Sequence, residues 1–223
     1  MKYQLYPKIN FVKGKKSDER HFNRLFRAIC LVDKKFLKIT VNNSSSENDL
    51  RNHKERVFAY ELYRQWANIL DSECKRSLIL NAELDKIIGD SNVLPKIITY
   101  PDIVLHQGQG NNKNQKIICE IKRNDPPRRY SRLFADLYKL SCFMDNKMMG
   151  KDKFGYGVLI LLDTTLDDIK KIKKKNCKIK VNKSNFYFSD FTKTMNNHFD
   201  NLICISYDGE TLEYETLSAI LGL

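Results

Sequence analysis

Three charged residues lie near the ends of two short apolar segments, where hydrophobic side chains would pack better. Asp102 opens the segment "DIVLH", and Glu120 and Lys122 close the segment "KIICEIK". Residues two apart on a strand share a face, so Glu120 and Lys122 are expected to point the same way. If the two strands pair, Asp102 approaches both of them. Neighbouring carboxylates repel each other unless a cation lies between them, so the pattern predicts a bound cation.

The chemistry of this residue set is that of hydrolysis at a phosphate. Carboxylate oxygens favour a hard divalent cation, and we therefore expect Mg²⁺ or Mn²⁺ at Asp102 and Glu120. Lys122 offers a positive charge for a phosphate oxygen, or a proton-transfer group for a water molecule. A metal-activated water beside such residues is what phosphodiester hydrolysis needs. The residues therefore predict a hydrolase that acts on nucleic acid.

The surrounding segments predict an α/β chain, in which helices cover the faces of a mixed sheet. Apolar periodicity gives a helix over 50–70, strands over 77–84, 102–106 and 116–122, a helix over 130–148 and a strand over 154–163. The first three strands follow one another, which favours a meander that feeds a helical crossover. Outside this order we expect a helix over 17–36, a helix over 165–175, a strand over 201–208 and a C-terminal helix over 210–223.

The pattern "YPDIVLH…IICEIK" resembles the signature of the PD-(D/E)XK nuclease superfamily, which has the restriction-endonuclease-like fold. Pro101 and Asp102 match the "PD", and Glu120, Ile121 and Lys122 match the "ExK". The core of that family is helix, three strands, helix, strand, which is the order expected above. The resemblance implies that Asp102 and Glu120 bind the metal, and that Lys122 positions or deprotonates the attacking water.

The resemblance also implies a further acid, on the first core helix or near the end of the first strand. Glu61 in "FAYELYRQW" and Glu83 in "LILNAELDK" stand in those places. Because a strand end is held more firmly than a helix face, we expect Glu83 to border the site more directly than Glu61.

The matching segment is about half of the chain, and it suggests a division into regions. Residues 1–41 are expected to form a basic N-terminal helical region, and residues 42–223 a nuclease-like domain. The core of that domain would be about 50–162, with a C-terminal extension over 163–223.

A strongly basic composition favours a polyanionic partner, and nucleic acid first. The formal net charge is +12 and the isoelectric point is about 9.3. Basic residues that follow the proposed metal site are expected to hold phosphates: Arg123, Arg128, Arg129, Arg132 and Lys139. Arg129, Arg132, Asp136 and Lys139 should lie opposite the apolar stripe of the helix over 130–148. DNA is the more expected substrate, and duplex cutters often need two active sites, so fold analogy allows a homodimer.

Each assignment has a structural alternative. Asp102 could cap a turn, and Glu120 and Lys122 could form an exposed edge-strand face. Glu61 and Glu83 could be solvated, and so could the basic helix face. For the whole chain, the alternatives are a non-catalytic nucleic-acid-binding module that keeps the nuclease fold, or a basic protein in which the motif is accidental. The sequence distinguishes neither the form of the substrate nor the biological role.

Cysteine spacing and hydropathy bear on the compartment. The six cysteines are scattered singly without the spacing of a zinc site, which predicts reduced thiols. No apolar run approaches the roughly 20 residues that span a bilayer, and the N-terminus lacks the apolar region of a secretory signal. We therefore expect a cytoplasmic protein without a membrane partner.

Overall fold

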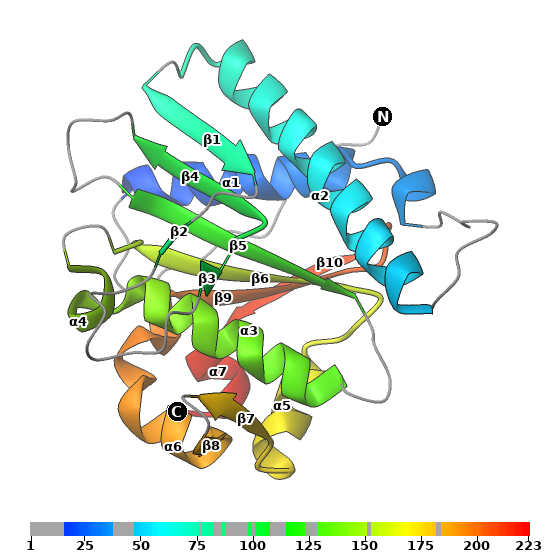
Figure 1. The fold of residues 1–223 in the computed structure, drawn as a ribbon. Helices are drawn as coiled ribbons and strands as arrows, with labels where there is room; N and C mark the ends of the chain where they lie inside the picture. The colour runs from blue at the N-terminus through cyan, green and yellow to red at the C-terminus, as the bar shows by residue number, and fades with distance from the viewer. Residues whose placement is uncertain are drawn as a thin grey trace.

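The computed structural model describes residues 16–37, 47–75, 77–82, 86–87, 98–99, 101–107, 115–123, 129–150, 153–181 and 184–223. These residues form an α/β fold in which helices flank both faces of a six-stranded mixed sheet (Figure 1). The sheet has the order β1 (Leu78–Ala82), β4 (Ile103–Gln107), β5 (Gln115–Arg123), β6 (Tyr156–Leu162), β9 (Leu202–Tyr207) and β10 (Leu212–Thr216). The expected fold class, a mixed sheet flanked by helices, is confirmed.

The helices and two small hairpins complete the described chain. The helices are α1 (Lys16–Leu31), α2 (Glu47–Ser72), α3 (Arg129–Met144), α4 (Asn146–Met149), α5 (Asp167–Lys174), α6 (Phe188–Thr194) and α7 (Leu217–Leu221), with 3₁₀ turns η1 (Lys34–Phe36) and η3 (Asn196–Asn201). The hairpins pair β2 (Lys86–Ile87) with β3 (Ile98–Thr99), and β7 (Lys178–Val181) with β8 (Ser184–Tyr187). None of the helices in the described part of the chain is long and apolar enough to cross a membrane.

The sheet changes from antiparallel to parallel at β5. Strands β1, β4 and β5 pair antiparallel, and the register sets Ile103 beside Cys119. Helix α3 then carries the chain to β6, which runs parallel to β5 with Leu159 beside Glu120. Strand β9 lies parallel to β6 on its other side, and β10 returns antiparallel. The buried sequence "YGVLILL" suits β6, because a parallel strand in the middle of a sheet is covered on both faces.

Two hydrophobic cores lie on the two faces of the sheet. The first contains the apolar side chains of α1 and α2 together with Ile117, Cys119 and Ile121 of β5. The second contains α3, α5, α6 and α7, and it includes Ile118 of β5 and Leu159 of β6. Since side chains alternate along a strand, Glu120 must point to the same side as Ile118, which is the side of α3.

Three of the expected helices end or begin elsewhere. The helix expected over 17–36 stops at Leu31, and the 3₁₀ turn η1 follows it. The helix expected over 130–148 stops at Met144, and a new short helix begins after Asp145, whose side chain accepts the N–H groups of Lys147 and Met148. The helix expected over 210–223 is wrong for its first half, because residues 212–216 form strand β10. Only the last turn, α7, is helical, and Thr216 caps its N-terminus.

Candidate active site

The structure places Asp102, Glu120 and Lys122 together at one end of the β4–β5 pair. Asp102 directly precedes β4, and its Oδ2 accepts a hydrogen bond of 2.6 Å from the backbone N–H of Ile121. Glu120 and Lys122 flank Ile121 on β5 and point to the α3 side of the sheet. The three side chains therefore share one face, as the alternation along the strands predicts.

Two further acids reach Lys122 from helices on either side of the strand. Its Nζ lies 3.6 Å from Glu55 Oε2 of α2 and 3.5 Å from Asp136 Oδ2 of α3. Glu55 Oε1 also accepts the backbone N–H of Arg123 at 2.9 Å, which ties the start of α2 to the end of β5. Lys122 is thus held between two carboxylates.

Lys139 of α3 is the second cation of the cluster. Its Nζ lies 2.6 Å from Glu120 Oε1, and the Glu120 side chain is almost fully buried. Four carboxylates, those of Glu55, Asp102, Glu120 and Asp136, therefore face two ammonium groups. We name these six residues the acid cluster, and acid is in excess within it.

Burial dominates the protonation of the carboxylates. It raises the pKa of Asp102 to about 6, although the Ile121 N–H and the nearby lysines oppose this rise. The pKa of Glu120 is raised well above its usual range by burial and by the charge of Asp102. Burial also raises the pKa values of Glu55 and Asp136. The cluster therefore holds its negative charges at a cost, and added positive charge would relieve that cost.

For Lys122, the charges of neighbouring carboxylates outweigh the effect of burial on the pKa. Burial by itself lowers its pKa, but the carboxylates of Asp136 and Glu55, followed by Glu120 and Asp102, raise it by more. The net result is a pKa above the usual lysine value, so Lys122 is an ammonium ion at neutral pH.

The donor set of the cluster fits a hard divalent cation. Within the described ranges, no three His, Cys, Asp or Glu side chains are already arranged to hold a metal ion. Asp102 and Glu120 nevertheless offer oxygen ligands only, and burial and mutual repulsion raise the pKa of Glu120. A cation between them would reverse that effect, and Mg²⁺ or Mn²⁺ is the type that carboxylate oxygens select.

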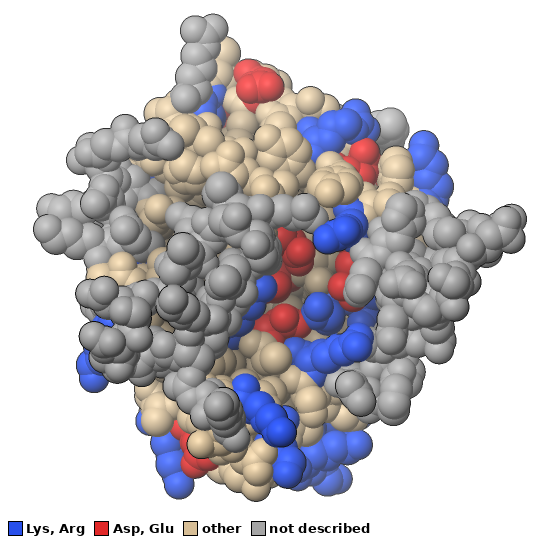
Figure 2. All heavy atoms as spheres, viewed as in Figure 1, with Lys and Arg blue, Asp and Glu red and all other residues tan. Residues whose placement is uncertain are grey.

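The space-filling view (Figure 2) shows acidic side chains recessed below the surface of one face of the molecule. Figure 2, in the orientation of Figure 1, shows atoms of Asp and Glu recessed in a hollow near the middle of this face. Atoms of Lys and Arg lie beside them and along the hollow. Charged groups of both signs are therefore accessible from this side of the molecule.

The expectation for Glu61 needs correction. Its carboxylate contacts Arg64 Nη2 at 2.6 Å and Gln65 Nε2 at 2.7 Å, and the acid of this helix that reaches Lys122 is Glu55. Glu61 comes six residues later, which is about 9 Å along the helix axis and about two thirds of a turn around it. Glu83 lies outside the described residues, so its comparison with Glu61 remains a prediction.

The structure describes the side chains of three of the five basic residues expected to hold phosphates, which are Arg123, Arg132 and Lys139. Arg128 lies outside the described residues, as does the side chain of Arg129 at the start of α3. Arg132 is half-buried on α3, and Arg123 forms an ion pair with Asp163 at the end of β6.

Lys139 and Asp136 do not lie where the helix pattern placed them. They were expected opposite the apolar stripe of α3, but their side chains are 17% and 13% exposed and contact β5. The reason is that α3 crosses the polar end of β5, where the partner of the helix is a charged strand rather than an apolar one.

A sequence signal for the two missed acids exists in the apolar stripes. Glu55 precedes Phe58 by three residues and Leu62 by seven, so it continues the buried stripe of α2. Asp136 stands three residues after Leu133 and four before Leu140, both buried. A carboxylate in register with a buried stripe indicates a buried partner.

Comparison with known proteins adds no relative. No family model matches the chain, and no curated protein or solved structure matches it. The function must therefore be argued from the residues of this chain.

Proposed function

We propose that the protein is a Mg²⁺- or Mn²⁺-dependent nuclease of the PD-(D/E)XK type that hydrolyses phosphodiester bonds, in DNA rather than RNA. The observation that carries the proposal is the convergence of Asp102, Glu120 and Lys122 on one sheet face. The order α2, β1, β4, β5, α3, β6 supports a restriction-endonuclease-like core, with the small β2–β3 hairpin inserted before β4. Glu55 supplies the acid from the first core helix.

Each residue has a distinct task in the proposed site. Asp102 and Glu120 would hold the metal, which when bound supplies an activated water and stabilises charge on the phosphate oxygens. Lys122 is a cation at neutral pH, and an ammonium has no lone pair to accept a proton. We therefore assign it to orient the water and to stabilise charge on the phosphate, with Glu55 and Asp136 fixing its position.

Cleavage assays with single-residue variants test this proposal. Wild-type protein should cleave DNA in the presence of Mg²⁺ or Mn²⁺, and EDTA should abolish cleavage. Duplex, single-stranded and branched DNA should each be compared with RNA as the substrate. Lys122→Met removes the charge but keeps a side chain of similar length. Its cleavage rate should fall by about 100-fold or more, while titration calorimetry still detects Mn²⁺ binding. Asp102→Asn should lose both.

The matched control is Lys170→Met, on the exposed side of α5, where the lysine contacts only Asp167 in the described part of the chain. This variant should cleave as fast as wild type. If folded wild-type protein leaves every substrate intact with both metals, the enzyme proposal is wrong.

A non-catalytic nucleic-acid-binding module is the second candidate, and one observation favours it. Lys139 already contacts Glu120, and Lys122 already lies between Glu55 and Asp136. In this alternative the lysines satisfy the carboxylates permanently, and the cluster is structural. It predicts nucleic-acid binding that EDTA leaves unchanged and no cleavage under any condition.

A further inference from the structure

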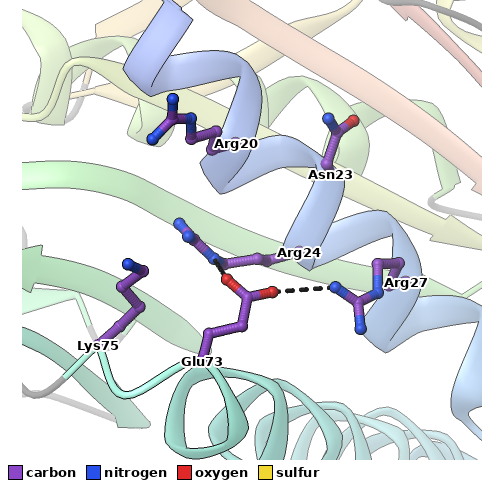
Figure 3. Close-up of a pocket in the computed structure, with 6 residues that line it drawn as sticks. All are labelled: Arg20, Asn23, Arg24, Arg27, Glu73 and Lys75. Carbon is purple, nitrogen blue, oxygen red and sulfur yellow. Dashed lines mark hydrogen bonds and ion pairs between the residues drawn. The ribbon is translucent and has the colours of Figure 1, made fainter.

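A second charged hollow lies between α1 and the end of α2, at the far end of α2 from the acid cluster. It has a volume of about 480 Å³, and Figure 3 shows its lining residues, which are Arg20, Asn23, Arg24, Arg27, Glu73 and Lys75. Glu55 and Glu73 are 18 residues apart, which corresponds to about 27 Å along the axis of α2. The hollow is therefore separate from the site proposed for catalysis.

The arginines of the hollow already hold one anionic group. Arg24 Nε contacts Glu73 Oε2 at 2.7 Å, and Arg27 Nη1 contacts Glu73 Oε1 at 2.9 Å. Figure 3 shows this clamp, in which two side chains of α1 converge on the carboxylate. Arg24 is only 6% exposed, so its guanidinium is fixed by its surroundings. Fixed guanidinium groups of this kind recognise carboxylate and phosphate oxygens.

Positive charge remains in excess after Glu73 is paired. Arg20 and Lys75 are exposed and form no ion pair with any described residue. In Figure 3, Lys75 faces the Arg24 guanidinium from the turn after α2, and Arg20 lies on the neighbouring turn of α1. Four basic side chains and one carboxylate thus line the hollow, which has room for a further anion.

A buried histidine lies beside the hollow, next to Arg24. His21 Nδ1 lies 3.3 Å from Arg24 Nη1. Burial first, and then the charges of Arg24 and Lys116, lower the pKa of His21 to about 4, although the charge of Asp18 opposes this shift. The imidazole is therefore neutral at pH 7 and leaves the positive charge to the arginines and lysine that face solvent.

We propose that this hollow is an anion site that binds phosphate groups, carried either by the backbone of a polynucleotide or by a free nucleotide. The clamp on Glu73 holds Arg24 and Arg27 in place, and Arg20 and Lys75 supply the unpaired charges that contact the phosphate oxygens. This binding requires no divalent metal and does not depend on the proposed nuclease activity.

The test measures binding in EDTA, where cleavage does not occur. The ligands are a fluorescent 12-nucleotide single-stranded DNA, followed by anisotropy, and ATP and inorganic pyrophosphate, followed by calorimetry. The test variant is Arg20→Ala/Lys75→Ala, which changes two exposed side chains. The control is Lys178→Ala/Lys180→Ala on β7, which removes the same charge from two exposed positions.

The hollow variant should bind at least about 10-fold more weakly than wild type, and the control within about 2-fold. Each lost phosphate contact should also reduce the slope of log affinity against log salt by about 0.7 for a single strand. Arg20→Lys/Lys75→Arg should retain binding. Weakening for all three ligands assigns the site to free phosphate groups, and weakening for DNA alone assigns it to the polynucleotide backbone.

Two outcomes overturn the proposal. One is equal affinity of the hollow variant and the control variant for every ligand, with melting curves that show both to be folded. The other is equally tight binding of a polyglutamate of matched charge, which would show an anion site without preference for phosphate. Neither outcome bears on cleavage in the presence of metal, so the nuclease proposal is tested separately.

Discussion

At the scale of single residues, the acid cluster is governed by the cost of burying carboxylates. Lys122 and Lys139 lower the pKa values of their neighbours, but the desolvation of Asp102 and Glu120 is the larger effect. The buried negative charge of such a cluster is unfavourable, and a bound cation would reduce its free-energy cost. Its stability and its proposed activity should therefore respond in opposite directions to the loss of a carboxylate.

Asp102→Asn should make the metal-free protein more stable at neutral pH. The pKa of Asp102 is raised from 3.8 to about 6 in the folded state, so between these pH values the unfolded chain releases a proton that the folded chain keeps. The contribution of Asp102 to stability is therefore complete below pH 3.8 and is lost as pH rises through 6, a loss of up to about 3 kcal/mol. Asparagine does not titrate and retains an oxygen for the Ile121 N–H.

Thermal melts in EDTA at pH 4.5 and pH 8 check this expectation. The variant should exceed wild type clearly at pH 8 and by much less at pH 4.5, and Mg²⁺ should reduce the gap by stabilising only wild type. An equal difference at both pH values would show that charge burial is not its cause.

Glu55 and Glu61, which both lie on α2, should differ clearly in an activity assay. Glu55→Gln keeps an oxygen for the Arg123 N–H but removes one of the two charges that hold Lys122. On the proposed function, cleavage should fall by about 100-fold, because a displaced catalytic group is costly. Glu61→Gln changes a carboxylate that contacts Arg64 and Gln65, and should stay within about 3-fold of wild type. A larger loss in Glu61→Gln would restore the original assignment.

Sequence reasoning found part of this cluster for a specific physical reason. Asp102, Glu120 and Lys122 interrupt apolar strands, and the alternation of strand side chains brings them to one face. The contacts of Lys122 with Glu55 and Asp136 join residues 67 and 14 positions away, through helices whose rotation depends on tertiary packing. Local periodicity does not contain that rotation, so these partners appeared only in the structure.

At the scale of elements, α3 is held against the sheet by close approach at one glycine. A Cβ built on Gly157 of β6 would lie 2.8 Å from Met144 Sδ and 3.2 Å from Leu140 Cβ, both on α3. The missing side chain lets the helix lie low on the strand. The position of Asp136 and Lys139 above β5 depends on the same seating of α3.

Gly157→Ala should therefore destabilise the fold by about 1–3 kcal/mol through overpacking. The matched control is Gly155→Ala, where the new Cβ would lie 3.4 Å from the Lys116 carbonyl oxygen and 3.7 Å from the Gln115 carbonyl oxygen, which are ordinary contact distances. Urea unfolding of the two variants makes the comparison. Equal stabilities would mean that α3 moves away from β6 without cost.

The wrong helix over 210–223 shows how a neighbouring strand overrides local preference. Leu212, Tyr214 and Thr216 alternate with Glu213 and Glu215, which is the period of a strand, and their half-buried and exposed classes alternate in the same way. Glutamate and leucine favour helices in isolation, and this preference led to the wrong prediction. Pairing with β9 decides the outcome, because the free backbone edge of a buried strand gains hydrogen bonds from β10.

At the scale of the whole molecule, one sheet separates two cores and shares its strands between them. Residues 163–223, which the resemblance did not include, supply β9 and β10 to that sheet and α5, α6 and α7 to the core on the α3 side. Helix α1 packs with α2 in the other core. Both cores border β5 and β6, so a substitution that destabilises one core should also destabilise the other.

Phe191→Ala should therefore shift the unfolding of the entire described fold, including a reporter on the opposite face. Phe191 is fully buried among the aromatic rings of Phe134, Phe188 and Phe199, and its truncation should cost about 3–5 kcal/mol. Trp66 is the single tryptophan and is fully buried in the core on the other side of the sheet. Its fluorescence should lose its native signal at the same lowered temperature as the far-ultraviolet circular dichroism, because parallel β5 and β6 belong to both cores.

Phe191→Leu keeps most of the volume and should move both signals by a smaller, equal amount. An unshifted Trp66 transition, with a separate earlier loss of dichroism, would show instead that the two faces of the sheet unfold independently.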